Sequence, residues 1–164
     1  MHRDFAMTLP PVLLATFAVA CPSIALAASC TLSLSGMTFG AYDVLTPTAL
    51  DTTSTINVAC TRTVSPNERV NYTLTASVGS GASYASRSMA QGVERLNYNL
   101  YRNAARSQIW GNGTGGSQTI TGTHNLSNGS PTRNRNHTLY GRIPALQNVA
   151  AGNYLDTLAI TLIF

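Results

Sequence analysis

The sequence predicts an all-β domain, an antiparallel β-sandwich, and three observations lead to this prediction. Apolar and polar residues alternate in several short segments, which is the pattern of strands with one buried face. Turns rich in glycine and asparagine separate these segments at short intervals, as in sandwich domains. No segment carries a convincing helical spacing of apolar residues, although residues 87–96 could hold one helical turn.

The first 27 residues predict a secretory signal peptide. A basic start at His2 and Arg3 precedes an apolar stretch, and Ala25-Leu26-Ala27 forms a small-x-small site with cleavage expected after Ala27. A transmembrane anchor is disfavoured because prolines leave an uninterrupted run only at residues 12–20, and a span needs about 20 apolar residues. Cys21, in a loose lipoprotein-like context, is expected to leave with the signal. We therefore expect a domain over 28–164 that is exported through the Sec pathway to the periplasm, then to the cell surface.

Two cysteines, Cys30 and Cys60, remain after that cleavage, and an even pair in an exported chain predicts a disulfide. Closing a loop of about 30 residues stabilises a fold by about 3.5 kcal/mol in the loop-entropy model. No metal or other cofactor is expected. His124 and His137 are far along the chain from the cysteines and lack the spacing of metal ligands.

The basic residues are scattered rather than clustered. The chain has ten Lys and Arg residues against six Asp and Glu, a net charge of +4. Only Arg133-Asn134-Arg135 is locally dense, so a solvated surface is favoured over a nucleic-acid site. Weak attraction to acidic polysaccharide or lipid head groups stays open.

The expected strands follow one another along the whole domain. The clearest alternation places Val70, Tyr72, Leu74, Ala76 and Val78 on one face. The other segments with this pattern are residues 30–35, 56–60, 96–100, 109–110, 138–143 and 154–164. Neither an internal repeat nor a linker interrupts this series, which predicts one domain.

Several short motifs occur in a fixed order over residues 30–164. They include Phe39-Gly40-Ala41-Tyr42, Ile56-Asn57-Val58-Ala59-Cys60, Leu96-Asn97-Tyr98-Asn99-Leu100-Tyr101, Ile109-Trp110-Gly111-Asn112-Gly113 and Gly152-Asn153-Tyr154-Leu155-Asp156-Thr157-Leu158. The ordered set resembles the spore coat protein U domain, which is shared with subunits of archaic chaperone–usher pili.

This resemblance implies an immunoglobulin-like sandwich that lacks its last strand. A periplasmic chaperone would fill the gap first, and the N-terminal segment of another pilus subunit would replace it at the outer-membrane usher. Such strand addition uses main-chain hydrogen bonds for affinity and alternate apolar side chains for register. The residues expected to form the acceptor groove are Leu32, Leu34, Leu158, Ile160, Leu162 and Phe164.

One feature departs from the fibre-forming members of the family. Cleavage after Ala27 would leave only Ala28 and Ser29 before Cys30, too little for a donor strand. We therefore expect a subunit that accepts a strand without donating one, in a tip-like or accessory position.

Enzymatic activity is not expected. The sequence has no Gly-x-Ser-x-Gly elbow to support a serine nucleophile, and the glycine-rich residues 111–116 lack the Lys-Ser/Thr of a phosphate loop. Asp43 and Asp51 are expected in loops, and Asp156 is expected to hydrogen-bond backbone or an arginine.

The first functional hypothesis is a structural or adhesive subunit of a bacterial surface fibre, in attachment or biofilm. The alternative is a secreted module that binds carbohydrate or a surface, and a secreted hydrolase is the third and weakest. Trp110 fits either the core or a sugar-stacking surface. The residues considered as surface contacts are Tyr84, Tyr101, Trp110, Arg133 and Arg135.

Overall fold

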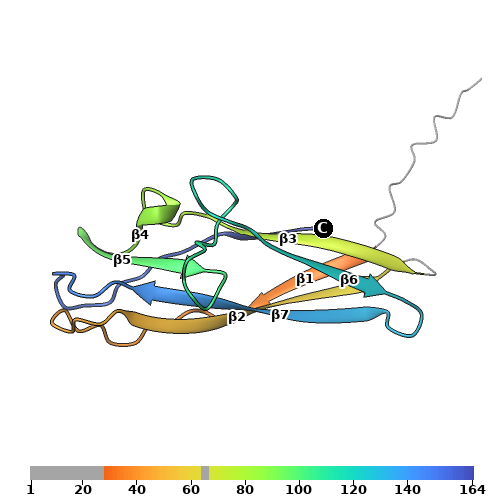
Figure 1. The fold of residues 1–164 in the computed structure, drawn as a ribbon, viewed down its shortest axis with the longest axis horizontal. Coiled ribbons are helices and arrows are strands. Elements are labelled where there is room, and N and C mark those ends of the chain that lie inside the picture. Colours follow the sequence, from red (N-terminus) through yellow and green to blue (C-terminus); the bar gives the residue numbers. More distant parts are fainter. Residues whose placement is uncertain (1–27, 64–66) are drawn as a thin grey trace, which may run out of the picture.

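Strands in two facing antiparallel sheets make up the computed structural model, which describes residues 28–63 and 67–164 (Figure 1). The strands are β1 (Ala28–Leu34), β2 (Leu50–Arg62), β3 (Glu68–Ala76), β4 (Arg87–Gln91), β5 (Glu94–Tyr101), β6 (Ile120–Leu126), β7 (Thr132–Ile143) and β8 (Ile160–Ile163). A short 3-10 helix, η1 (Tyr84–Ser86), precedes β4. The larger sheet has the order β1-β2-β7-β5-β4 and the smaller one β6-β3-β8, which confirms the predicted fold class. The predicted signal peptide lies outside the described residues.

The inner faces of the two sheets form the core where the alternation predicted it. In β3, Val70, Tyr72, Leu74 and Ala76 are all buried. The same holds for Leu96, Tyr98 and Leu100 of β5. Trp110 lies beneath β3 with no exposed surface, and its indole N–H donates to the carbonyl of Leu74 at 3.3 Å. A buried indole with a satisfied N–H is a core residue.

Two strands were not predicted, and two predicted strands are shorter than expected. β6 was missed, and β4 occupies the start of residues 87–96, where a helical turn was considered. Residues 109 and 110 make only isolated bridges, to Tyr101 and Gln118. The last predicted strand, 154–164, is regular only over β8.

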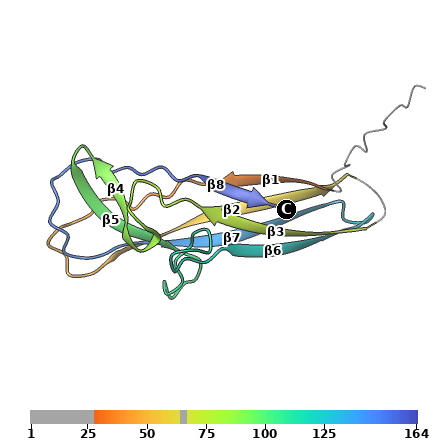
Figure 2. The same ribbon diagram turned by 90° about the horizontal axis from the view of Figure 1, so that it is seen from above.

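The sandwich has two long flanks where the sheets meet, and they differ in composition. Figure 2 shows β1 and β8 along one side and β6 and β7 along the other. We call the first side, formed by β1, β8 and residues 158–159, the apolar flank. The second, formed by β6 and residues 132–139 of β7, is the polar flank. Among the described residues, β1, β6 and β8 each have one edge without a strand partner, and so do residues 132–139 of β7.

Candidate functional site

The apolar flank is bordered by two unpaired strand edges. β1 pairs with β2 from Ala28 to Leu34, and β8 pairs with β3 from Ile160 to Ile163. Each of them is the terminal strand of its sheet in the part of the chain that the structure describes. They lie in different sheets on the same side of the sandwich and run in opposite directions (Figure 2). Backbone donors and acceptors are therefore open along both walls of this flank.

Half-buried apolar side chains line these edges. Leu32 on β1 packs against the core together with Leu158, Ile160 and Leu162. Leu34 and Phe164 are 44% and 48% exposed. The structure thus places all six residues predicted for an acceptor groove on or beside β1 and β8. Phe164 lies just past β8 and outside that strand.

The predicted disulfide joins Cys30 of β1 to Cys60 of β2. The two residues are direct cross-strand partners with their Cα atoms 4.1 Å apart. Cys60 is fully buried, whereas Cys30 lies at the flank. The bond therefore fixes one wall of the apolar flank to the centre of the larger sheet.

A large cleft continues the apolar flank toward the other end of the sandwich. It has a volume of about 1010 Å³ and lies between the segment after β1, residues 37–44, and the segment before β8, residues 149–155. Met89, Leu96 and Ile143 form its floor. The sequence did not predict this cleft, although Met37 and Phe39 stand two residues apart, out of phase with the apolar residues of β1.

A glycine in β7 lets the first wall of the cleft pack closely. The inward register of β7 runs through Leu139, Gly141 and Ile143, and a Cβ at Gly141 would lie 2.5 Å from the sulfur of Met37 and 2.8 Å from the Phe39 ring. Phe39 also packs edge-on against Tyr98, with ring centroids 5.9 Å apart. The Met37-x-Phe39 segment therefore fills the space that a side chain at position 141 of β7 would occupy.

Asp156 anchors the second wall of the cleft. Its carboxylate accepts hydrogen bonds from the backbone N–H of Ser80 and Thr157, each at 2.8 Å, and from the Tyr98 hydroxyl at 2.6 Å. Burial, together with the hydrogen bond to Asp156, raises the pKa of Tyr98 well above its ordinary value. The predicted backbone role of Asp156 is confirmed, and this carboxylate fixes the chain just before β8.

Arg87 is a fully buried arginine next to this anchor. Its guanidinium donates to the side chain of Asn99 at 3.1 Å and to the carbonyl of Ser77 at 2.9 Å, and it lies 5.1 Å from the Tyr84 ring centroid. Burial lowers the pKa of Arg87. This polar network connects β4 and β5 to Ser77. Ser77 in turn hydrogen-bonds Ala159 through its backbone N–H and its side-chain oxygen.

Two of the predicted surface contacts are wrong. Trp110 is completely buried and Tyr84 is only 7% exposed, because the Tyr84 hydroxyl donates inward to the carbonyl of Ala76 at 3.0 Å. Tyr101 is half-buried where β5 pairs with β7. Arg133 and Arg135 are exposed on β7.

The two histidines lie close together on the polar flank. The Tyr72 ring stacks on His124, with centroids 5.2 Å apart, and its hydroxyl is 2.8 Å from Nε2 of His137. Burial is the main cause that lowers the pKa of each histidine, and the Arg135 charge adds to it. Within residues 28–63 and 67–164, no three His, Cys, Asp or Glu residues are grouped as a metal site would need.

Asp43 and Asp51 contact neighbouring groups of the fold. Asp43 lies in a loop, where it accepts from the backbone N–H of Leu45. Asp51, expected in a loop, is in β2 and binds Arg142 through both oxygens at 2.7 and 2.8 Å, with Arg106 at 3.2 Å. The hydrogen bonds from Arg142 hold the pKa of Asp51 below its usual value. No described helix has the length and apolar character needed to cross a membrane.

Three comparisons with known proteins agree with this picture. Residues 13–161 match the Spore Coat Protein U domain. The chain is 33% identical over 135 residues to Protein U of Myxococcus xanthus, an alignment that covers 78% of this chain and 71% of that protein.

Among solved structures, the fold resembles a chain in the chaperone–tip adhesion subunit pre-assembly complex, CsuC–CsuE, from the archaic chaperone–usher Csu pili of Acinetobacter baumannii. The TM-score is 0.53 at 17% identity. The match covers 84% of this chain and spans 40% of the length of the other, so it supports the fold alone.

Proposed function

This chain belongs to the Spore Coat Protein U domain family, and from this membership and the open apolar flank we propose that it is a structural subunit of a bacterial surface fibre. In this role it accepts a β-strand from a partner polypeptide between β1 and β8. It acts by assembly rather than by catalysis. The single observation that carries the proposal is the pair of unpaired backbone edges bordering half-buried apolar side chains.

An inserted strand would pair the open backbone edges of this flank and would cover its half-buried apolar side chains. Since β1 and β8 run in opposite directions, it would be antiparallel to one wall and parallel to the other (Figure 2). Each main-chain hydrogen bond contributes about 1 kcal/mol net. Covering each half-exposed leucine or isoleucine contributes on the order of 1 kcal/mol more.

The partner strand must alternate apolar and polar residues. Only every second side chain of an inserted strand points between the sheets, where Leu32, Ile160 and Leu162 lie. A longer donor would continue into the cleft lined by residues 37–44 and 149–155. An uncovered flank of this kind is an aggregation hazard, which a dedicated partner removes.

The partners that fit this chemistry are a periplasmic chaperone, an outer-membrane usher and further subunits of the same fibre. We propose that the chain is exported with removal of residues 1–27, and that the fibre serves attachment or biofilm. The choice of partners is an analogy with the solved complex that shares the fold, which contains a chaperone and a pilus tip subunit.

A charge placed on the apolar flank tests the proposal. Leu162→Glu puts a carboxylate where the partner's apolar side chains would pack, so the variant should no longer co-purify with a chaperone or appear in surface fibres of the source bacterium. Thr161→Glu is the matched control, because Thr161 is the neighbouring residue on the same strand and faces solvent. This variant should assemble normally.

Circular dichroism of both variants separates assembly from folding. Leu162 is half-buried, and the fold should persist after the substitution. Normal fibre assembly by Leu162→Glu, or equal loss in both variants with intact folds, would contradict strand acceptance on this flank.

A further inference from the structure

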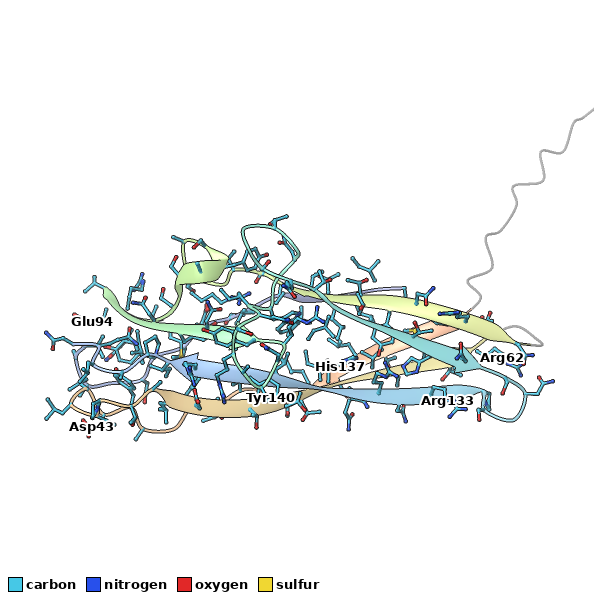
Figure 3. All side chains as sticks on the ribbon, in the orientation of Figure 1. Asp43, Arg62, Glu94, Arg133, His137 and Tyr140 are labelled. Atoms are coloured by element: carbon cyan, nitrogen blue, oxygen red, sulfur yellow. A yellow bond between two sulfur atoms is a disulfide. The ribbon has the colours of Figure 1, made fainter. Side chains whose placement is uncertain are left out.

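The polar flank holds a second concave site, distinct from the apolar flank. A cleft of about 320 Å³ opens where β5 separates from β7, because these strands pair only through Asn99–Tyr101 and Tyr140–Arg142. Its volume is at the lower end of the roughly 300–1,000 Å³ typical of small-ligand sites. The start of β6, the middle of β7 and the loop after β5 line it, and Figure 3 shows His137 and Tyr140 on this part of the molecule.

Arg102 lies exposed at the rim of this cleft, where hydrogen bonds hold both its side chain and its backbone. Its guanidinium donates to the carbonyl of Thr119 at 2.5 Å, and its backbone N–H donates to Gln108 at 3.0 Å. The loop after it is closed by Asn103, whose side-chain oxygen accepts from the backbone N–H of Ser107 and Gln108 at 3.2 and 3.0 Å. A fixed guanidinium loses little freedom when it binds an anion.

The same loop contains a strained residue. Arg106 has a φ of 52°, a left-handed conformation that is costly outside glycine. In this conformation its guanidinium lies 3.2 Å from Asp51 and 5.7 Å from the ring centroid of Tyr140, which lines the cleft. Backbone strain that holds a surface loop in one shape is common at binding sites.

Several other polar groups at the cleft carry no fixed charge and have hydrogen-bonding capacity left for a ligand. The hydroxyls of Thr121 and Thr138 make no side-chain hydrogen bond among the described residues, and the Asn136 amide is bonded only through its oxygen, to Asn57. With its Nε2 bonded to Tyr72, His137 keeps its second ring nitrogen for a ligand. Arg102 brings the charge, and none of the described residues that line the cleft is acidic.

We propose that this cleft binds one unit of an acidic polysaccharide, with Arg102 pairing with the carboxylate of a uronic acid. One fixed guanidinium surrounded by hydroxyl, amide and imidazole groups and an aromatic ring fits a sugar that carries one carboxylate. It fits a phosphate less well, because phosphate favours several cations or a row of backbone N–H groups. This inference does not depend on strand acceptance, because the cleft lies on the opposite flank.

Calorimetric titration of the full chain with trigalacturonic acid tests this inference. The methyl-esterified trisaccharide has the same rings without the charge, and acetate is the carboxylate without the rings. We expect saturable binding of the acid, and at least tenfold weaker binding of both controls. Loss of one charge-assisted hydrogen bond corresponds to about that factor.

Two variants locate the site, and a third is the control. Arg102→Gln should weaken trigalacturonate binding about tenfold or more, and Thr138→Val should weaken it less while leaving the fold unchanged. Arg95→Gln removes the same charge from another arginine that binds backbone carbonyls, at the end of the sandwich where Figure 3 labels Glu94. This control should bind as the parent does.

Several results would overturn the inference. They are no binding of trigalacturonate, equal binding of the ester, equal binding of acetate, or equal weakening by Arg95→Gln and Arg102→Gln. Unchanged binding by both Thr138→Val and Arg102→Gln would also place the ligand elsewhere.

Discussion

The two flanks of the sandwich both present open strand edges, but different kinds of side chain border those edges. The apolar flank exposes Leu34 and leaves Ile160 and Leu162 half-buried, so its surface is unfavourable in water. The polar flank packs Tyr72 between two histidines and carries arginines at its margin. An edge bordered by charge resists strand addition, whereas an edge bordered by leucine favours it. In the proposed function, composition rather than the open edge itself therefore decides which flank would accept a strand.

Removing the disulfide should produce the largest effect, and only the apolar flank contains one. We expect the Cys30→Ala, Cys60→Ala double variant to lose about 3.5 kcal/mol of unfolding free energy, since the unfolded chain regains the entropy of the closed loop. Urea denaturation of parent and variant measures the difference. Reduction of the parent with dithiothreitol should give a similar loss, and a loss below 1 kcal/mol would contradict a stabilising role.

Filling the space at Gly141 should be the next largest effect. Gly141→Ala places a methyl group against Met37 and Phe39, and we expect a loss of about 2 kcal/mol from overpacking. Gly36→Ala is the control, because a Cβ there meets nothing within 4 Å. Thermal unfolding of the two variants compares them, and equal melting temperatures would show that the cleft wall is not closely packed.

On the polar flank, Tyr72→Phe removes the hydroxyl that bonds to His137. We expect a loss of about 1 kcal/mol, the usual net contribution of one hydrogen bond. Tyr154→Phe removes a comparable hydroxyl bond that is exposed to solvent, and it should cost less. The midpoints of urea denaturation measure both losses of stability. A larger loss in Tyr154→Phe would show that the bond from Tyr72 to His137 is not the stronger of the two.

The smallest expected effect is a pH dependence that belongs to the polar flank. Burial lowers the pKa of His124 and His137 below the ordinary 6.5, so the unfolded chain binds more protons than the folded one in mildly acidic solution. Stability should therefore be complete above pH 6.5 and should fall as the pH drops toward the folded pKa values. Urea denaturation at a series of pH values measures the slope, which His137→Gln should reduce. A slope that His137→Gln leaves unchanged would assign the effect to other groups.

The sequence predicted the strands whose inner faces are apolar throughout. β3 and β5 alternate cleanly because every inward residue packs directly on the core. β6 was missed because its inward positions include Gly122 and His124, which break the apolar period. Tertiary packing explains the glycine, since a Cβ at Gly122 would collide with the Tyr72 ring. No local pattern reveals a partner that is about 50 residues away.

The candidate site shows the same limit. Leu32, Ile160 and Leu162 were found by alternation, but residues 154–159 were wrongly assigned to the last strand. Asp156 turns toward Tyr98 and Ser80, and Leu155 bonds with Ala90 of β4 instead of extending β8. Trp110 and Tyr84 were considered for the surface because the sequence shows that they are aromatic but does not show whether their side chains point inward or outward.

The covalent bond between Cys30 and Cys60 has a mechanical consequence. In the proposed fibre, a pulling force would act in shear on β1 and β8, the two strands between which the donor strand would lie. β8 is short, and β1 alone could peel from its neighbour. The cross-strand bond passes the load from β1 directly into β2, which runs for 13 residues through the larger sheet. Under tension, therefore, this wall should yield only after the sheet behind it does.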